Sequence, residues 1–147
     1  MKIVIGSDHA GVKLKKLIID NYSNEKISFL DVGTDSEESV DYPDYISKVG
    51  EVIIKKEADL GIAICGTGIG ASIVTNKMAG IRGALCFNEF MAEMSKKHNN
   101  ANVLVLGARV IGDDLALRIV DTWFKTDFEG GRHQRRIDKI LKIEANF

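Results

Sequence analysis

Short runs rich in Val and Ile alternate with longer segments of helical period, and this alternation constrains the fold more than any other feature. The apolar runs cover residues 2–5, 27–32, 60–65, 83–87 and 103–106. They are almost wholly apolar, as is typical of parallel strands buried on both faces. Helices are expected at 14–22, 43–53, 72–78, 89–97, 115–123 and 134–143.

This order predicts an α/β fold: a single doubly wound, Rossmann-like domain over residues 1–147, with a five-stranded parallel sheet and helices on both faces. A length of 147 residues agrees with one domain. The last helix, at about 134–143, is a candidate for packing on a partner subunit.

Charge and composition exclude several classes of protein. Twenty Lys and Arg residues against twenty-one Asp and Glu residues give a net charge of −1, which provides no overall attraction to nucleic acid or to a membrane surface. No apolar run approaches the roughly 18 residues of a transmembrane helix. Two cysteines make a poor disulfide framework, so we expect a reducing, cytoplasmic location.

The carboxyl ends of the predicted strands are where ligands bind in open α/β sheets. The polar residues expected at this edge are Asp8 and His9 after the first strand, Asp41 and Tyr42 in a loop after the second, Cys65 after the third and Arg109 after the fifth. A carboxylate, an imidazole, a phenol, a thiol and a guanidinium at one edge predict a catalytic cleft.

A glycine loop, Gly66-Thr67-Gly68-Ile69-Gly70-Ala71, follows the third strand. Such a loop turns backbone N–H groups toward an anion at a helix amino terminus. It also fits the relaxed dinucleotide fingerprint, with Glu89 about twenty residues on as the ribose-binding acid. Against that reading, the fingerprint usually follows the first strand of its unit, and a small single domain leaves little room for a second substrate. A tight turn without a ligand is the plain structural alternative.

Cys65 stands directly before the glycine loop. Helix amino termini and nearby cations stabilise thiolates, which act as bases or nucleophiles. We therefore assign Cys65 a chemical role and interpret Cys86 as a small buried apolar residue.

His98 and Asn99 close a helix just before the fifth strand, so they belong at the edge opposite Cys65. Alone, they are typical of a helix carboxyl terminus, with Asn as a cap and a cation favoured by the dipole. If they are catalytic, the simplest arrangement has them serving a neighbouring subunit's site, which predicts an obligate oligomer.

Arg132 and Arg136 are four residues apart at the start of the last helix and can share one face. Two guanidiniums beside a helix amino terminus make a phosphate clamp. The alternative is a solvated basic face, to which we assign His133 and Arg135. The three histidines and two cysteines lack zinc-ligand spacing, so no metal site is expected.

Taken together, these motifs resemble the ribose-5-phosphate isomerase type B family over essentially the whole chain. The motifs that carry the resemblance are Gly6-Ser7-Asp8-His9-Ala10-Gly11, Asp41-Tyr42-Pro43, Cys65-Gly66-Thr67-Gly68-Ile69-Gly70, Asn76-Lys77, His98-Asn99 and Gly130-Gly131-Arg132-His133-Gln134-Arg135-Arg136. The resemblance implies an aldose–ketose isomerase of the pentose phosphate pathway, without metal or other cofactor, that converts ribose 5-phosphate and ribulose 5-phosphate through an enediol. It also implies homodimers, in some members paired into tetramers, with active sites shared between subunits.

The resemblance assigns a role to each candidate residue. Cys65 is the implied base, Thr67 a proton shuttle, and His98 with Asp8 the pair that opens the sugar ring. The implied binding residues are Gly66, Gly68, Ile69 and Gly70 for the enediolate, Asn99 for a hydroxyl, Tyr42 for the pocket wall, and His9, Arg109, Arg132 and Arg136 for the phosphate.

Three alternatives stay open at this stage. The same chemistry could act on a hexose 6-phosphate, of allose or galactose. Galactose 6-phosphate isomerases pair two different subunits, whereas Cys65, His98 and both clamp arginines occur in this one chain. A non-catalytic module that binds a nucleotide or sugar phosphate would keep the arginines and the glycine loop but tolerate loss of Cys65. A dinucleotide enzyme ranks last.

Overall fold

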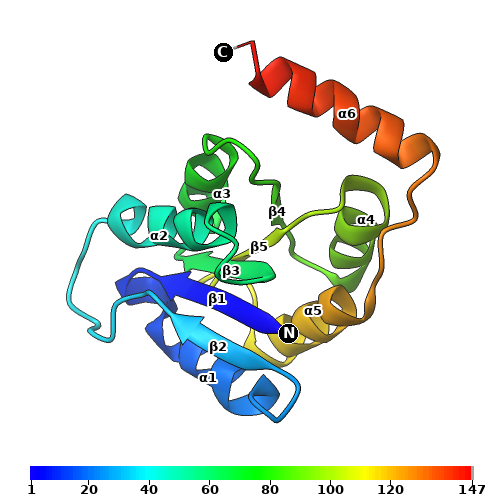
Figure 1. Ribbon diagram of the computed structural model, residues 1–147. Coiled ribbons are helices and arrows are strands. Elements are labelled where there is room, and N and C mark those ends of the chain that lie inside the picture. Colours follow the sequence, from blue (N-terminus) through cyan, green and yellow to red (C-terminus); the bar gives the residue numbers. More distant parts are fainter. Residues whose placement is uncertain (147) are drawn as a thin grey trace.

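A computed structural model describes residues 1–146 and contains a five-stranded, all-parallel sheet (Figure 1). The strands are β1 (Lys2–Ser7), β2 (Ser28–Asp31), β3 (Leu60–Cys65), β4 (Gly83–Leu85) and β5 (Val103–Gly107), in the order β2-β1-β3-β5-β4. The helices are α1 (Val12–Tyr22), α2 (Tyr42–Ile54), α3 (Ile69–Asn76), α4 (Glu89–Asn99), α5 (Asp113–Lys125) and α6 (Arg132–Glu144), with a short 3-10 turn η1 (His9–Gly11) before α1. Among these helices, none has the length and apolar character needed to cross a bilayer.

The side chains of the sheet alternate between two cores, which confirms the doubly wound prediction. Ile62 and Ile64 of β3 face a core built with α1, α4 and α5. Ala63 and Cys65 of the same strand face a second core built with α2 and α3. Successive strand residues point to opposite faces, so this register places the Cys65 side chain on the α2–α3 side. Figure 1 shows α2 and α3 together on one face of the sheet.

Two of the helices that begin earlier than predicted carry candidate site residues at their starts. α3 starts at Ile69 rather than near residue 72, because Gly68 takes the left-handed conformation (φ 80°) and caps the helix immediately after the strand. α6 starts at Arg132 rather than 134, directly after the left-handed Gly130 and Gly131. As a result, the glycine loop and the clamp arginines both lie at helix amino termini.

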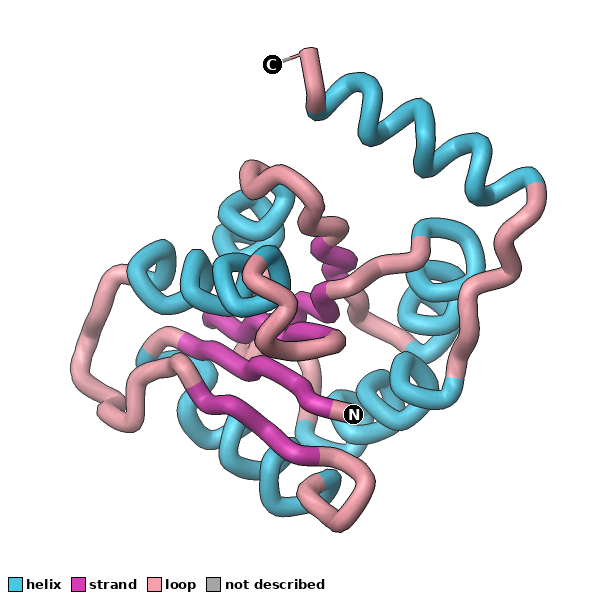
Figure 2. The backbone as a smooth tube through the Cα atoms, viewed as in Figure 1, coloured by secondary structure: helices cyan, strands magenta, loops and turns pink. Residues whose placement is uncertain are grey.

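α6 stands apart from the layered body, as the tube in Figure 2 shows. Its inward contacts include Ile137, which is buried, and a hydrogen bond from the Gly80 N–H to Glu144 Oε1 at 2.9 Å. Ile140 and Ile143 of the same helix remain 46% and 61% exposed. The helix thus carries apolar side chains that this chain alone does not cover.

Candidate active site

The residues predicted to form a cleft follow β1 and β3, the two strands between which the strand order reverses. The loops that follow these two strands meet: the Asp8 N–H donates to the carbonyl of Ile64 at 3.3 Å. Asp8 itself is 5% exposed, and its Oδ1 accepts from the Ala10 N–H at 2.9 Å. A buried carboxylate is therefore fixed beside the end of β3.

Cys65 is the last residue of β3 and is 4% exposed. Its Sγ accepts a hydrogen bond from the Gly68 N–H at 3.2 Å. Because Gly68 caps α3, the sulfur lies at the amino terminus of a helix, where the positive end of the helix dipole is found.

Cys86 behaves as the sequence predicted, as a buried apolar residue. It is 1% exposed, and burial raises the pKa of its thiol to about 11, with Ser95 partly opposing that shift. Neither cysteine is in a disulfide.

The glycine loop is held in place by close contact with β4 and β5. A Cβ on Gly68 would overlap Leu85, and one on Gly107 would overlap the carbonyl oxygen of Thr67. In addition, the Arg109 N–H donates to the Gly66 carbonyl at 2.8 Å. The loop can take this position only because both facing residues lack a side chain.

Tyr42 and Arg109 border this loop. Tyr42 is the first residue of α2 and not part of the preceding loop, because Asp41 is the N-cap and Pro43 favours the first helical turn. A Cβ on Gly70 would lie 2.7 Å from Tyr42 Cζ, and one on Gly66 would lie 3.4 Å from Arg109 Nη1. A phenol and a guanidinium therefore lie beside the loop's backbone amides, as predicted.

His9 is oriented by the loop between β2 and α2. The Val40 N–H donates to His9 Nδ1 at 3.1 Å. An accepting Nδ1 places the hydrogen of a neutral ring on Nε2, which leaves Nε2–H as a donor for an anion.

Lys15 anchors the same loop and was not identified from the sequence. Its side chain is 2% exposed, and Nζ lies 2.7 Å from Asp31 Oδ2 and donates to the Thr34 carbonyl at 2.8 Å. One signal was available: Lys15 lies three residues before Ile18, on the apolar stripe of α1.

His98 and Asn99 lie at the end of α4, at the edge opposite Cys65, as predicted. Asn100, one residue further on, is the left-handed cap (φ 44°). β5 then begins at Val103 and ends at Gly107, the partner of Cys65 in the sheet. A strand rises about 3.3 Å per residue, so the two ends of β5 are about 13 Å apart.

His133 corrects the sequence interpretation, which assigned it to a solvated face. The residue is 2% exposed, and its ring stacks on His98 with centroids 4.2 Å apart and planes at 10°. Arg132 Nε lies 3.5 Å from one ring nitrogen and Arg136 Nη1 lies 3.4 Å from the other. The missed signal is the position of His133 four residues before the buried Ile137; Arg135 is exposed as predicted.

One group of three metal-capable side chains occurs within residues 1–146. The ligating atoms of His98, Glu129 and His133 lie within 4.8 Å of one another. However, imidazole lone pairs lie in the ring plane, and those of two stacked rings run side by side instead of converging on one ion. With two guanidiniums alongside, the group fits a stacked pair in a cationic cluster better than a metal centre.

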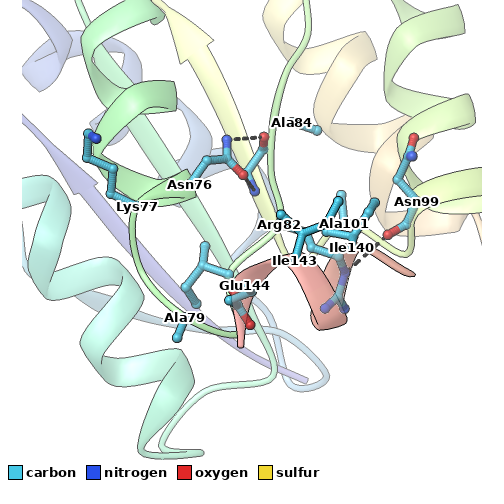
Figure 3. Close-up of a pocket in the computed structure, with 12 residues that line it drawn as sticks. Asn76, Lys77, Ala79, Arg82, Ala84, Asn99, Ala101, Ile140, Ile143 and Glu144 are labelled. Carbon is cyan, nitrogen blue, oxygen red and sulfur yellow. Dashed lines mark hydrogen bonds between the residues drawn. The ribbon is translucent and has the colours of Figure 1, made fainter. Parts of the chain in front are cut away.

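A groove of about 950 Å³ lies between α6 and the body (Figure 3). Its lining includes Asn99, Ile140 and Ile143, and Arg82 Nε donates to the Asn99 carbonyl at 3.1 Å. The groove lies near Gly83, where β4 begins, and so at the edge opposite Cys65.

Glu89, the acid that the dinucleotide interpretation assigned to a ribose, has another partner. Glu89 begins α4 and accepts a hydrogen bond from Arg118 Nε at 2.7 Å. The carboxylate that would recognise a ribose is already paired with a cation.

Comparisons with known proteins agree on one family. A family model described as Ribose/Galactose Isomerase matches residues 3–140. The chain is 46% identical over 143 residues to ribose-5-phosphate isomerase B of Escherichia coli, covering 97% of this chain and 96% of that protein. A structure of ribose-5-phosphate isomerase B from Clostridium thermocellum is similar with a TM-score of 0.97 at 55% identity, covering 99% of both chains. That of Mycoplasma genitalium, solved with ribulose 5-phosphate bound, is similar with a TM-score of 0.93 at 42% identity, covering 99% of this chain and 97% of that one.

Proposed function

The chain belongs to the ribose/galactose isomerase family, and from that membership we propose that it interconverts ribose 5-phosphate and ribulose 5-phosphate in the pentose phosphate pathway. The observation that carries this proposal is the position of the Cys65 thiol, which accepts a hydrogen bond from the Gly68 N–H within a loop of backbone donors. The relative solved with ribulose 5-phosphate bound supports the choice of substrate.

The chemistry requires a base and donors for an oxyanion. A proton next to a carbonyl is weakly acidic, so the enediolate must be stabilised as it forms. Cys65 removes the proton from one of C1 and C2 and returns it to the other, and the amides of Gly66, Gly68, Ile69 and Gly70 hold the oxyanion. Without substrate, the Gly68 and Ile69 N–H groups donate within the loop, to Cys65 Sγ and Thr67 Oγ1, and the oxyanion takes the place of these acceptors. Thr67 Oγ1 accepts from the Ile69 N–H at 3.2 Å, which leaves its own O–H to shuttle a proton to the sugar oxygen.

The other residues bind the substrate or open its ring. Asp8 and His98 assist opening of the furanose, and Asn99 holds a hydroxyl. Tyr42 lines the pocket. The phosphate is bound by His9 through Nε2–H, by Arg109 and by the clamp residues Arg132 and Arg136.

These residues fall into two groups at opposite edges of the sheet. The carboxyl-edge half comprises Asp8, His9, Tyr42, residues 65–70 and Arg109. The α4–α6 half comprises His98, Asn99, Arg132 and Arg136. One chain does not bring the halves together, so we propose a homodimer, alone or paired into a tetramer, in which each site takes one half from each subunit. The exposed Ile140 and Ile143 on α6 support a helix that packs on a second copy.

Turnover measured in EDTA tests the reaction and its substrate. We expect conversion of ribose 5-phosphate without added metal, and slower conversion of allose 6-phosphate and galactose 6-phosphate. The family model's description names both ribose and galactose, so a preference for a hexose phosphate would reassign the substrate and keep the chemistry. Binding of these sugar phosphates without turnover of any of them would instead favour a non-catalytic module.

Mixing two inactive variants tests the shared site. Cys65→Ala and His98→Ala damage different halves, so a hybrid dimer keeps one intact site. Random exchange should restore about a quarter of wild-type activity, because half of the dimers are hybrids with one working site of two. No recovery, once mass spectrometry has verified subunit exchange, would contradict the shared site.

The proposed location is the cytoplasm. Both cysteines are free, and reducing compartments keep thiols unpaired.

A further inference from the structure

We infer that His133 is a positioning residue that holds the phosphate-binding Arg136 and the ring-opening His98 as a single unit. The inference rests on the proposed function, which assigns roles to those two neighbours. His133 itself is 2% exposed and points away from solvent, so its part is to act through the groups that it contacts.

The hydrogen bonding of the His133 ring requires a neutral imidazole. A guanidinium only donates, so Arg136 Nη1, at 3.4 Å from Nδ1, needs that nitrogen as an acceptor. The hydrogen then lies on Nε2, where Glu129 Oε2 at 3.4 Å can accept it. Arg132 Nε also points its hydrogen at Nε2, at 3.5 Å, which is the longest of the three contacts. With the hydrogen on Nε2 the contacts to Glu129 and Arg136 are satisfied and the contact to Arg132 is not, and we assign this tautomer. A neutral His133 thus bridges a carboxylate and a clamp arginine.

The opposite side of the same ring supports His98. The two imidazoles are stacked with 4.2 Å between centroids and 10° between planes. The backbone strengthens this contact, because the Glu129 N–H donates to the Lys97 carbonyl at 3.2 Å, next to His98. The start of α6 is therefore tied to the last turn of α4 at the stacked pair.

The charges around His133 favour its neutral form. Burial first, and then His98, Arg132 and Arg136, lower the pKa of the ring, while Glu129 acts in the opposite direction. Protonation would turn Nδ1 into a second donor facing Arg136. The surroundings thus maintain the acceptor that the clamp arginine needs.

Two substitutions separate the two contacts. His133→Phe keeps an aromatic face against His98 but removes the acceptor for Arg136. His133→Asn keeps an amide oxygen near the Nδ1 position but removes the stacked ring. The exposed neighbour Arg135 offers a matched control, Arg135→Gln, on the same turn of the helix.

Opposite kinetic effects are expected for the two variants. His133→Phe should raise KM for ribose 5-phosphate and the inhibition constant of inorganic phosphate about 10-fold or more, the size expected for a hydrogen bond to a charged group, with kcat nearly unchanged. His133→Asn should lower kcat, with a much smaller change in phosphate inhibition. A purely structural residue would give both variants the same loss in kcat and KM, in step with their loss of thermal stability, and that result would overturn the inference.

A spectroscopic readout removes the dependence on turnover. The ring current of a stacked aromatic shifts the His98 ring protons upfield, so their signals in a ¹H–¹³C spectrum should stay shifted in His133→Phe and move toward ordinary values in His133→Asn. The affinity for inorganic phosphate, measured by calorimetry, tests the other contact of His133, the one with Arg136. If the wild type converts no sugar phosphate, the proposed function fails. The positioning role itself would be overturned by unchanged His98 signals in His133→Asn together with unchanged phosphate affinity in His133→Phe.

Discussion

The two halves of the proposed site are built in different ways. The carboxyl-edge half is made largely of backbone: the glycine loop supplies amides, and its position follows from close contact with β4 and β5. The α4–α6 half is made of side chains on a helix end and on a helix that stands apart from the body (Figure 2). Stabilising an oxyanion requires donors in fixed positions, which a loop packed against β4 and β5 provides. Holding a remote phosphate requires charge, which exposed arginines provide.

This contrast predicts where activity and stability are coupled. Substitutions that displace the glycine loop should reduce both quantities. Substitutions of the clamp arginines should affect binding and leave the free energy of unfolding nearly unchanged. The following four predictions test that division.

The largest effect is expected for Cys65→Ala. Loss of the proposed base should lower kcat by about 10²–10⁴-fold, the usual contribution of general acid–base catalysis, with a small change in melting temperature. Steady-state kinetics in EDTA measure this. Cys86→Ala, in the core and away from the site, should keep kcat while costing some stability. An active Cys65→Ala enzyme would show that another group is the base.

Gly107→Ala should reduce both stability and activity. The new Cβ would overlap the Thr67 carbonyl, and overpacking of this kind costs about 1–3 kcal/mol in the free energy of unfolding. Because Thr67 belongs to the glycine loop, kcat should fall as well. Urea unfolding and kinetics check the two effects. For comparison, Gly112→Ala meets nothing within 4 Å and should change stability by no more than about 0.5 kcal/mol. Equal losses of stability and kcat in the two glycine variants would contradict the coupling of stability and activity at the glycine loop.

Arg136→Ala should weaken binding without weakening the fold. Removing one charged hydrogen bond to the phosphate should raise KM about 10–100-fold. Because Arg136 is exposed and its contact with the buried His133 is long, at 3.4 Å, the free energy of unfolding should fall by only about 1 kcal/mol. Arg135→Ala, which removes the same charge from the next position, should leave KM within about 2-fold, as expected for a screened surface charge. A large loss of stability in Arg136→Ala would mean that the two halves are built alike after all.

The smallest effect concerns pH. The pKa of His133 lies below its ordinary value of 6.5, first because the ring is buried and then because of His98 and the two arginines. The unfolded chain therefore takes up this proton at a higher pH than the folded chain does. The free energy of unfolding should therefore fall as the pH drops below 6.5. Above that value the ring is neutral in both states, and His133 should contribute nothing to the pH dependence of stability. Urea midpoints at pH 7.5 and 5.5 should differ less in His133→Phe than in the wild type; an unchanged difference would contradict the pKa assignment.

Local patterns predicted most of the fold. The apolar run 60–65 matches β3 at both ends, and Pro43 marks the start of α2. The residues of the carboxyl-edge half could also be grouped from the sequence, because the loops that follow parallel strands all lie at one edge of the sheet. These features depend on period and chain order, which a sequence displays directly.

Long-range packing accounts for what the sequence did not predict. His133 is buried because α4 covers it, and Lys15 is buried because oxygens of Asp31, Thr34 and Asp35, at the end of β2 and in the loop after it, surround its ammonium group. The early start of α3 depends on the left-handed Gly68, whose close neighbours come from β4 and β5. In each case, a residue's surroundings are supplied by a segment far away in the chain.

The fit between the glycine loop and Gly107 determines which parts of this scaffold are open to redesign. Neither partner accepts a side chain, so the wall of amides has a fixed shape and cannot retreat to admit a longer sugar. The proposed facing wall is different, because Tyr42 lies in the first turn of α2, is 37% exposed, and approaches Gly70 through the end of its side chain, the ring and the hydroxyl. Engineering the enzyme for a six-carbon sugar phosphate should therefore begin with a smaller side chain in place of Tyr42, and the glycine loop should be left unchanged.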